Sequence, residues 1–502
     1  MESLESTVAQ FADTVWSWAA VPIVLALGLY FTIRSGFVQV RLLPRMLGTL
    51  TDRTPTDAEG RPQSLSAFQA FTVSAASRVG IGNIAGVGTA IAMGGPGAVF
   101  WMWIMAFVGG ASSFVESTLA QLYKRRDTDG FRGGPAYYME RGLKARWLGV
   151  FFSVLLIVST PIAVNALQSN TISVTIQGTV GDGAPTWLPY AIAGAIAVLT
   201  AAVVFGGIHR IANVTQALVP AMALLYLAVG AVILVINWDQ LLPVFGDIFD
   251  DAFSGRSVAG GAIGTVIMMG VRRGIFSNEA GLGTAPNAAA SAATTHPVKQ
   301  GLVQTLGVYF DTWLVCSITA FIILVSRPDL SGTPDGMTLT HDAIVGSLGS
   351  WSGVLITVIV FLLAFSTILG CYFYGEANLE FITTKKGWLA IYRAFAIAAV
   401  FVGALSSAAL VWNLMDAILA LLAVTNLVAI ALLSRHAFAL LRNYSEQAKR
   451  GLDPVFTRDQ LPQIENVDAW EDYESVTGLS ADTDQRGTNT ASADARETVA
   501  SS

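Results

Sequence analysis

The chain is poor in charged residues. Only 13% of its 502 residues are Asp, Glu, Lys or Arg, whereas soluble globular domains carry about 25%. Hydrophobic residues make up 53% and come in long runs, not in alternating or amphipathic patterns. A helix crosses a bilayer with about 20 consecutive apolar residues. The composition therefore excludes an ordinary soluble protein and predicts an all-α membrane protein with many spans.

Other scarcities exclude several kinds of site. Two cysteines, Cys316 and Cys371, both inside apolar runs, support neither a disulfide framework nor a thiolate metal site. The four histidines are not paired at ligand spacing, so zinc is equally unsupported. A net charge of -6 gives no basic surface for nucleic acid. The sequence also lacks G-x-x-x-x-G-K-[ST], H-E-x-x-H and G-x-S-x-G motifs, so we expect neither an ATP-driven pump nor an intramembrane enzyme.

Eleven apolar segments are long enough to span a bilayer. Lys and Arg orient them, because cytoplasmic loops carry the excess of these residues. One set of alternate connections, together with the end of the chain after the last span, holds 22 basic residues, whereas the other set holds only Arg256 and Arg327. This asymmetry predicts a cell-membrane protein with the N-terminus outside and the C-terminus inside. The segments lie at about 18–37, 66–94, 96–123, 147–177, 187–207, 213–236, 260–291, 300–326, 350–381, 390–410 and 412–438.

The composition changes near residue 443. Between Gly451 and Ser502 there are eleven acidic residues and only three Arg, with many Ser, Thr and Ala. Such a segment buries too little apolar surface to offset the entropy lost on ordering. We therefore predict a transmembrane transporter domain over residues 1–442 and an acidic, disordered cytoplasmic tail over residues 443–502.

Two of the spans contain residues that an uninterrupted helix in lipid would not tolerate. Residues 77–88 read SRVGIGNIAGVG and residues 270–283 read GVRRGIFSNEAGLG. A glycine costs about 1 kcal/mol relative to alanine in a helix, and an Arg at mid-membrane costs at least about 2.5 kcal/mol. Packing of helices through small residues explains the glycines, but not Arg78, Asn83, Asn278 and Glu279. Irregular backbone at membrane depth is tolerated where it lines a cavity, so both segments predict helix breaks at a central binding site.

The two breaks lie in the second and the seventh span, five spans apart. An odd number of helices in each unit inverts the second unit relative to the first. Spans two to six and seven to eleven are therefore expected to form a five-plus-five inverted repeat with two broken helices, plus one extra N-terminal helix. This pattern is typical of secondary transporters that bind substrate and ion near the bilayer midplane.

Ionisable residues inside the spans are candidates for function, because they are rare in membranes and usually paired. We expect Glu279 to pair with an Arg. For Glu116 and Glu376, which lie near the predicted cytoplasmic ends of their spans, contact with water is an equally good interpretation. The acidic candidates are Glu116, Glu279, Asp311, Glu376 and Asp416, and the candidate partners are Arg78, Arg272 and Arg273.

The sequences around both breaks resemble signature blocks of a known family. Residues 80–103 (GIGNIAGVGTAIAMGGPGAVFWMW), 272–286 (RRGIFSNEAGLGTAP) and 365–376 (FSTILGCYFYGE) are similar to three blocks of the alanine/glycine:cation symporter family. The similarity extends over roughly residues 10–445. The resemblance implies sodium-coupled secondary active uptake of small neutral amino acids by alternating access. Proton coupling through the buried carboxylates is the alternative.

The resemblance also implies a substrate site. The substrate carboxylate is expected on the N–H groups of Ile81 and Gly82, because the start of a half-helix attracts anions. Phe276 is expected to close the pocket, and Gln168, in a span interrupted by Pro161, to contribute a polar group. For Gln168, an amide bonded to a neighbouring helix is the alternative. The implied substrate-binding residues are Gly80, Ile81, Gly82, Gln168, Phe276, Ser277, Asn278, Thr367 and Cys371.

A sodium site is implied in the same way. Sodium is a hard cation that prefers oxygen ligands. The implied ligands are the carbonyl oxygens of Ala76, Val79 and Leu363 and the hydroxyls of Ser366 and Thr367, with Asn83 as a candidate for a second ion. The alternative for each hydroxyl is a hydrogen bond to its own helix.

Two positions depart from the family pattern. Cys371 stands where many members carry a Trp, and Ile81 replaces a common Thr. A smaller residue at position 371 is expected to enlarge the pocket. Alanine specificity is therefore open, and a larger aliphatic amino acid becomes possible.

Overall fold

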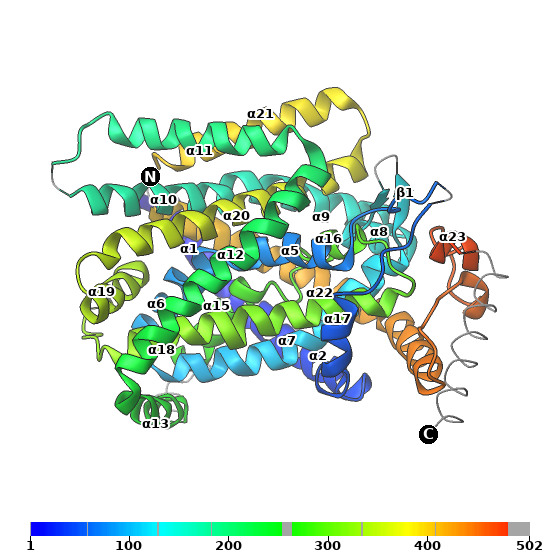
Figure 1. Cartoon of the computed structure of the whole chain (residues 1–502), viewed down its shortest axis with the longest axis horizontal. Coiled ribbons are helices and arrows are strands. Elements are labelled where there is room, and N and C mark those ends of the chain that lie inside the picture. The colour runs from blue at the N-terminus through cyan, green and yellow to red at the C-terminus, as the bar shows by residue number, and fades with distance from the viewer. Residues whose placement is uncertain are drawn as a thin grey trace, which may run out of the picture.

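Long helices run side by side along the horizontal axis of Figure 1 and form most of the protein. The computed structural model describes residues 2–57, 59–127, 130–181, 183–253, 264–332, 335–406 and 408–479. Within these ranges, eight helices are long and apolar enough to cross a membrane, and two shorter apolar helices cover Ile81–Gly94 and Leu188–Val204. The predicted all-α membrane class is confirmed.

The helices occur in the order expected of two repeats after an N-terminal helix. The N-terminal helix consists of α1 (Glu2–Val15), η1 (Trp16–Ala20) and α2 (Val21–Arg34). The first repeat contains α5 (Ala67–Arg78), η2 (Ile81–Asn83), α6 (Ala85–Gly94), α7 (Gly97–Leu122), α9 (Arg146–Ser159), η3 (Thr160–Asn165), α10 (Ala166–Val180), α11 (Leu188–Val204) and α12 (Gly207–Ile236). The second contains α15 (Thr265–Asn278), α16 (Pro286–Ala290), α17 (Pro297–Val308), η5 (Tyr309–Cys316), α18 (Ser317–Val325), α20 (Ser352–Ile382), α21 (Lys386–Gly403) and α22 (Ala408–Lys449).

Both predicted breaks are present. The first follows α5, where Gly80 has an extended backbone before the short η2 turn. The second follows α15, where Glu279, Gly281 and Gly283 all have positive φ angles. Left-handed backbone cannot continue a right-handed helix, so α15 and α16 are two separate half-helices. Pro161 does not break its span: the helix passes through it as the π-helical segment η3 and continues as α10. Residues 260–263 of the predicted seventh span and Arg256 lie outside the described residues.

Smaller elements cover the two ends of the bundle. At the right of Figure 1 are the hairpin β1 (Arg125–Asp127) and β2 (Gly130–Arg132), α8 (Pro135–Arg141) and α23 (Tyr473–Thr477). At the left are α13 (Leu241–Ala252) and α19 (Gly336–Leu348). The remaining short helices are α3 (Val38–Arg41), α4 (Leu43–Thr49), η4 (Trp238–Gln240) and η6 (Arg458–Gln460).

The predicted disorder from residue 443 onward is wrong for residues 443–479. Helix α22 continues to Lys449, and residues 450–479 fold over the end of the bundle that carries α8. Trp470 is buried and donates its indole N–H to the Gln121 carbonyl at 3.1 Å, and Phe456 is buried beside it. These apolar side chains anchor a segment whose average composition is acidic. Residues 480–502 of the predicted tail lie outside the described residues.

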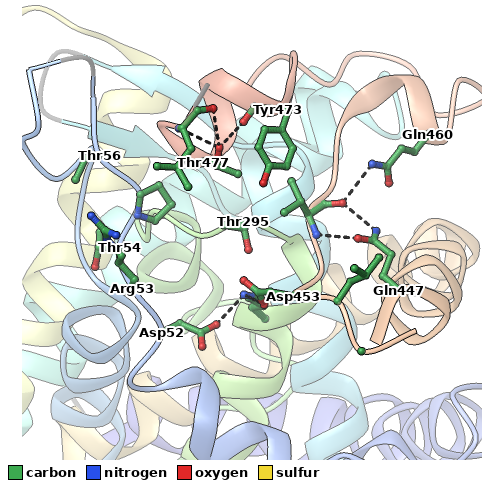
Figure 2. A pocket seen from close by; sticks show the side chains of 16 residues that line it. Asp52, Arg53, Thr54, Thr56, Thr295, Gln447, Asp453, Gln460, Tyr473 and Thr477 are labelled. Atoms are coloured by element: carbon green, nitrogen blue, oxygen red, sulfur yellow. Dashed lines mark hydrogen bonds and ion pairs between the residues drawn. The ribbon is translucent and has the colours of Figure 1, made fainter. Parts of the chain in front are cut away.

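Polar contacts also hold this C-terminal segment in place. Lys299, at the start of α17, bridges Asp453 and Asp52 at 2.6 and 2.9 Å. A cavity of about 550 Å³ lies between the segment and residues 52–56 (Figure 2). At its edge the Gln447 amide bonds both backbone groups of Val455, at 2.9 and 3.0 Å. Burial lowers the pKa of the nearby His296 to about 3, so its ring is neutral at physiological pH.

Candidate functional site

A small cavity lies where the two broken helices meet. The cavity has a volume of about 30 Å³, which holds only one or two water molecules. Its wall combines a charged and hydroxyl-rich part with an apolar part, as is typical of small-molecule sites. The lining residues are Ser77, Arg78, Gly80 and Gly82 from the first break, Phe276, Glu279, Leu282 and Thr284 from the second, Thr367, Cys371 and Tyr374 from α20, and Ser159, Thr160, Val164, Gln168, Leu419 and Leu422.

Most of the residues implied by the family resemblance meet at this cavity. Ile81 is fully buried beside it, and its N–H donates to Oε1 of Gln168 at 3.3 Å. Gln168 is therefore hydrogen-bonded to a neighbouring helix, as in the alternative interpretation. The group that it bonds, the N–H of Ile81, belongs to the first helix break. Ser277 and Asn278 do not line the cavity and contact a second polar cluster instead. The implied residues that do line it are Gly80, Gly82, Gln168, Phe276, Thr367 and Cys371.

Two glycines allow the walls to approach each other. A Cβ on Gly80 would lie 2.3 Å from Thr367 Oγ1, and one on Gly82 would lie 2.9 Å from a ring carbon of Phe276. Any larger residue would push α20 or the Phe276 ring away from the break. Phe276 also contacts Trp412, whose ring centroid is 5.5 Å away in an edge-on arrangement.

The oxygens implied for sodium also gather at the first break. Thr367 Oγ1 donates to the Leu363 carbonyl at 3.0 Å and to the Ala76 carbonyl at 2.9 Å. Ser366 Oγ donates to the Leu363 carbonyl at 2.8 Å and contacts the Met222 sulfur at 3.2 Å. Both hydroxyls thus bond a carbonyl of their own helix, which was the alternative to ion binding. Thr367 in addition links α20 to α5 through the Ala76 carbonyl. Val79 has ψ 86°, so its carbonyl points out of the α5 hydrogen-bond ladder.

A second buried polar cluster surrounds Asp311 of η5. Its Oδ1 accepts from the Asn83 amide at 2.6 Å, and its Oδ2 accepts from Ser277 and Thr312 at 2.8 and 2.9 Å. Asn278 joins through Thr312 at 3.3 Å. The sequence marked most of these residues separately, but only the tertiary structure brings them together. Three neutral donors satisfy this carboxylate, and no ion pair to it occurs within the described ranges.

Glu116 of α7 supports the second break. It is completely buried and does not reach water, contrary to one of the two interpretations of the sequence. Its two carboxylate oxygens accept from the N–H groups of Gly281 and Gly283, both at 3.2 Å, and from the Asn426 amide at 2.7 Å. No motif of the sequence marks Asn426, a polar residue of α22.

Charged residues from α15, α22 and α1 form a layer of ion pairs. Arg272 contacts Asp416 of α22 at 2.7 Å and Asp13 of α1 at 2.6 Å. Arg273 lies 3.6 Å from Asp416 and 5.0 Å from the centre of the Trp412 ring. The expected pairing of Glu279 with an Arg is wrong within the described residues, because Arg272 and Arg273 face Asp416 and Arg78 donates to the Gln304 carbonyl. The extra N-terminal helix thus contributes Asp13 to a charged cluster with Arg272 of α15 and Asp416 of α22.

A cavity between two broken helices, inside two inverted five-helix repeats, defines a secondary transporter. The fold is similar to that of MhsT in its crystal structure with L-phenylalanine, with a TM-score of 0.53 and 13% identity over 78% of this chain and 90% of that one. The sodium:alanine symporter family model matches residues 1–458. The chain therefore belongs to the sodium:alanine symporter family, and it is an amino-acid symporter and not an enzyme.

Relatives match over nearly their full length. The amino-acid carrier protein AlsT of Bacillus subtilis is 47% identical over 94% of this chain and 99% of its own. The probable sodium/glutamine symporter GlnT of the same organism is 44% identical over 93% and 96%. The sodium/alanine symporter AgcS of Methanococcus maripaludis is 38% identical over 86% and 94%.

Proposed function

We propose that this protein takes up small neutral amino acids together with sodium, by alternating access. One observation carries the proposal. Gly80 lies beside both Thr367, the centre of the implied ion site, and Gln168, a wall of the cavity. A cation bound by Ala76, Val79, Leu363, Ser366 and Thr367 would fix the same break that receives the substrate, which couples the two binding events.

The substrate carboxylate is proposed to bind at the start of η2. The N–H groups of Ile81 and Gly82 point from the beginning of a half-helix, where the helix dipole favours an anion. Gln168 now accepts from Ile81 and would turn its amide donor to the carboxylate. The small cavity volume favours a compact substrate. The names of the relatives GlnT and AgcS support sodium coupling and a neutral substrate.

Asn83 and Asp311 are proposed to hold a second cation. The hydroxyls of Ser277 and Thr312 both lie within hydrogen-bonding distance of Asp311 Oδ2. Asn83 would add its own oxygen after its amide rotates. The rival function is proton coupling, because a buried carboxylate without an ion pair is also a proton carrier.

We assign the charged layer and the C-terminal segment to opposite sides of the membrane. We propose that the N-terminus lies outside the cell, so that Arg272, Asp416 and Asp13 close the outer side and residues 450–479 cover the inner side. A tenfold sodium gradient supplies about 1.4 kcal/mol, and 100 mV adds about 2.3 kcal/mol per charge. One sodium ion therefore sustains roughly 500-fold accumulation of a zwitterion, without ATP.

The test is uptake into proteoliposomes with the sodium and proton gradients imposed separately. We expect radiolabelled alanine or glutamine to accumulate with an inward sodium gradient at equal pH on both sides. A competitor panel of glycine, serine and larger aliphatic amino acids then gives the substrate range. Accumulation with a proton gradient in sodium-free buffer, and none with sodium, would overturn the sodium proposal in favour of its rival.

Cys371 is expected to set the upper size of the substrate. Its side chain lines the cavity, and its sulfur lies 3.1 Å from Ser77 Oγ. Cys371→Trp adds a ring to a cavity with little spare volume, so uptake of glutamine should fall at least about tenfold relative to glycine. Competition assays on wild type and variant measure this ratio, with Val354→Trp, at an exposed position of the same helix, as the control. An unchanged ratio would contradict this role.

A further inference from the structure

Glu279 is an acidic residue of the cavity wall whose charge no basic side chain neutralises by direct contact. Its carboxylate is buried and accepts from Ser77 at 2.5 Å, Thr284 at 2.9 Å and Tyr374 at 3.3 Å. No ion pair to Glu279 occurs in the part of the chain that the structure describes. Three neutral donors offset only part of the cost of burying a charge.

Arg78, the basic residue described in the cavity wall, makes no ion pair with Glu279. Arg78 donates to the Gln304 carbonyl at 3.2 Å and contacts Ser113 Oγ at 3.5 Å, so its guanidinium is directed at α17 and α7. Glu279 is thus the one acidic group that lines the cavity, among the residues described there. A positively charged ligand bound in the cavity would neutralise the Glu279 carboxylate.

The backbone fixes this carboxylate in place. Glu279 is the first residue after α15 and has φ 57°, a left-handed conformation that is costly for a residue with a side chain. This conformation turns the chain out of the helix at the point where the side chain enters the cavity wall. Thr284, five residues later, reaches back to the same carboxylate across the break.

Groups of opposite polarity border the cavity. The N–H groups of Ile81 and Gly82 lie at the start of a half-helix, where Ile81 donates to Gln168 of the cavity wall. The Glu279 carboxylate and the hydroxyls that bond it belong to the same wall. An α-amino acid carries a carboxylate and an ammonium group on one α-carbon, so it matches both kinds of group at once.

We propose that Glu279 binds the α-ammonium group of the substrate and selects amino acids over 2-hydroxy acids of the same shape, which lack that positive charge. The inference rests on the proposed function. The ammonium group has three donors, and the Glu279 carboxylate and the free carbonyls at the two breaks would accept them. Ser77 and Tyr374 would keep the carboxylate aimed into the cavity during transport.

The test compares each amino acid with its 2-hydroxy analogue in a binding assay on purified protein. The probes are L-alanine with L-lactate and L-glutamine with its 2-hydroxy analogue, competed against a radiolabelled amino acid in sodium buffer. We expect wild type to prefer the amino acid at least about 30-fold, as for a buried charge pair. In Glu279→Gln this preference should fall below about fivefold, because the amide lacks the negative charge that attracts an ammonium group far more strongly than a hydroxyl.

The control is Glu376→Gln, which removes a carboxylate of α20 that pairs with Arg393 and does not line the cavity. It should keep the wild-type preference even if affinity falls. A preference unchanged in Glu279→Gln, or lost equally in both variants, would overturn the inference and leave the proposed function standing. If wild type binds none of the amino acids, the proposed function itself is overturned together with the inference.

Discussion

Thr367→Val is expected to raise the sodium concentration for half-maximal uptake by about 10- to 100-fold. The substitution keeps the side-chain shape but replaces Oγ1, which lies 2.9 Å from the Ala76 carbonyl and 3.0 Å from the Leu363 carbonyl. Loss of one oxygen ligand to a buried cation costs about 1.5 to 3 kcal/mol. Uptake measured over a range of sodium concentrations in proteoliposomes gives the shift directly.

Thr357→Val is the matched control on the same helix. Its hydroxyl bonds the Gly353 carbonyl at 2.9 Å and the Thr179 hydroxyl, far from the break. It should leave the sodium dependence unchanged. If Thr367→Val lowers the maximal rate and leaves the sodium requirement at the wild-type value, Thr367 does not bind the ion and only joins α20 to α5.

Glu116→Ala is expected to lower uptake at least about 100-fold. The carboxylate holds the N–H groups of Gly281 and Gly283, and no helix satisfies these groups in the unwound segment. Removing it leaves two buried donors and the Asn426 amide without their acceptor, at about 1 to 3 kcal/mol each. The second break would then lose its shape, and with it the wall that carries Phe276 and Glu279.

Glu116→Gln tests whether the loss of uptake comes from a changed shape of the second break or from a failure of the whole protein to fold. A glutamine keeps one acceptor oxygen but turns its own N–H groups toward donors, so we expect an intermediate loss. Glu446→Gln, on the exposed surface of α22, should behave as wild type. Size-exclusion profiles show whether each variant is folded. Full activity in Glu116→Ala would show that the break is held by the backbone alone.

Much of the fold could be predicted because membrane insertion limits the choices. Apolar runs of sufficient length must be helical in lipid, since each backbone group has to be satisfied within its own segment. Clusters of glycine, Arg and Asn inside such runs mark breaks for the same reason. The prediction failed for residues 443–479, because a few widely spaced apolar residues such as Phe456 and Trp470 anchor a segment of acidic composition.

By itself the sequence determined the class of the protein, the order of its helices, the two breaks and the glycines that they require. These features follow from local chemistry and from the cost of polar groups in a bilayer. Only the tertiary structure decided which side chains meet across the breaks. Arg272 turns to Asp416 and Asp13, Glu279 faces the cavity, and Glu116 holds Gly281 and Gly283. Helix packing selects such partners, which lie as far apart in the chain as Glu116 and Asn426, at a separation of 310 residues, and the spacing of residues along one chain does not encode that geometry.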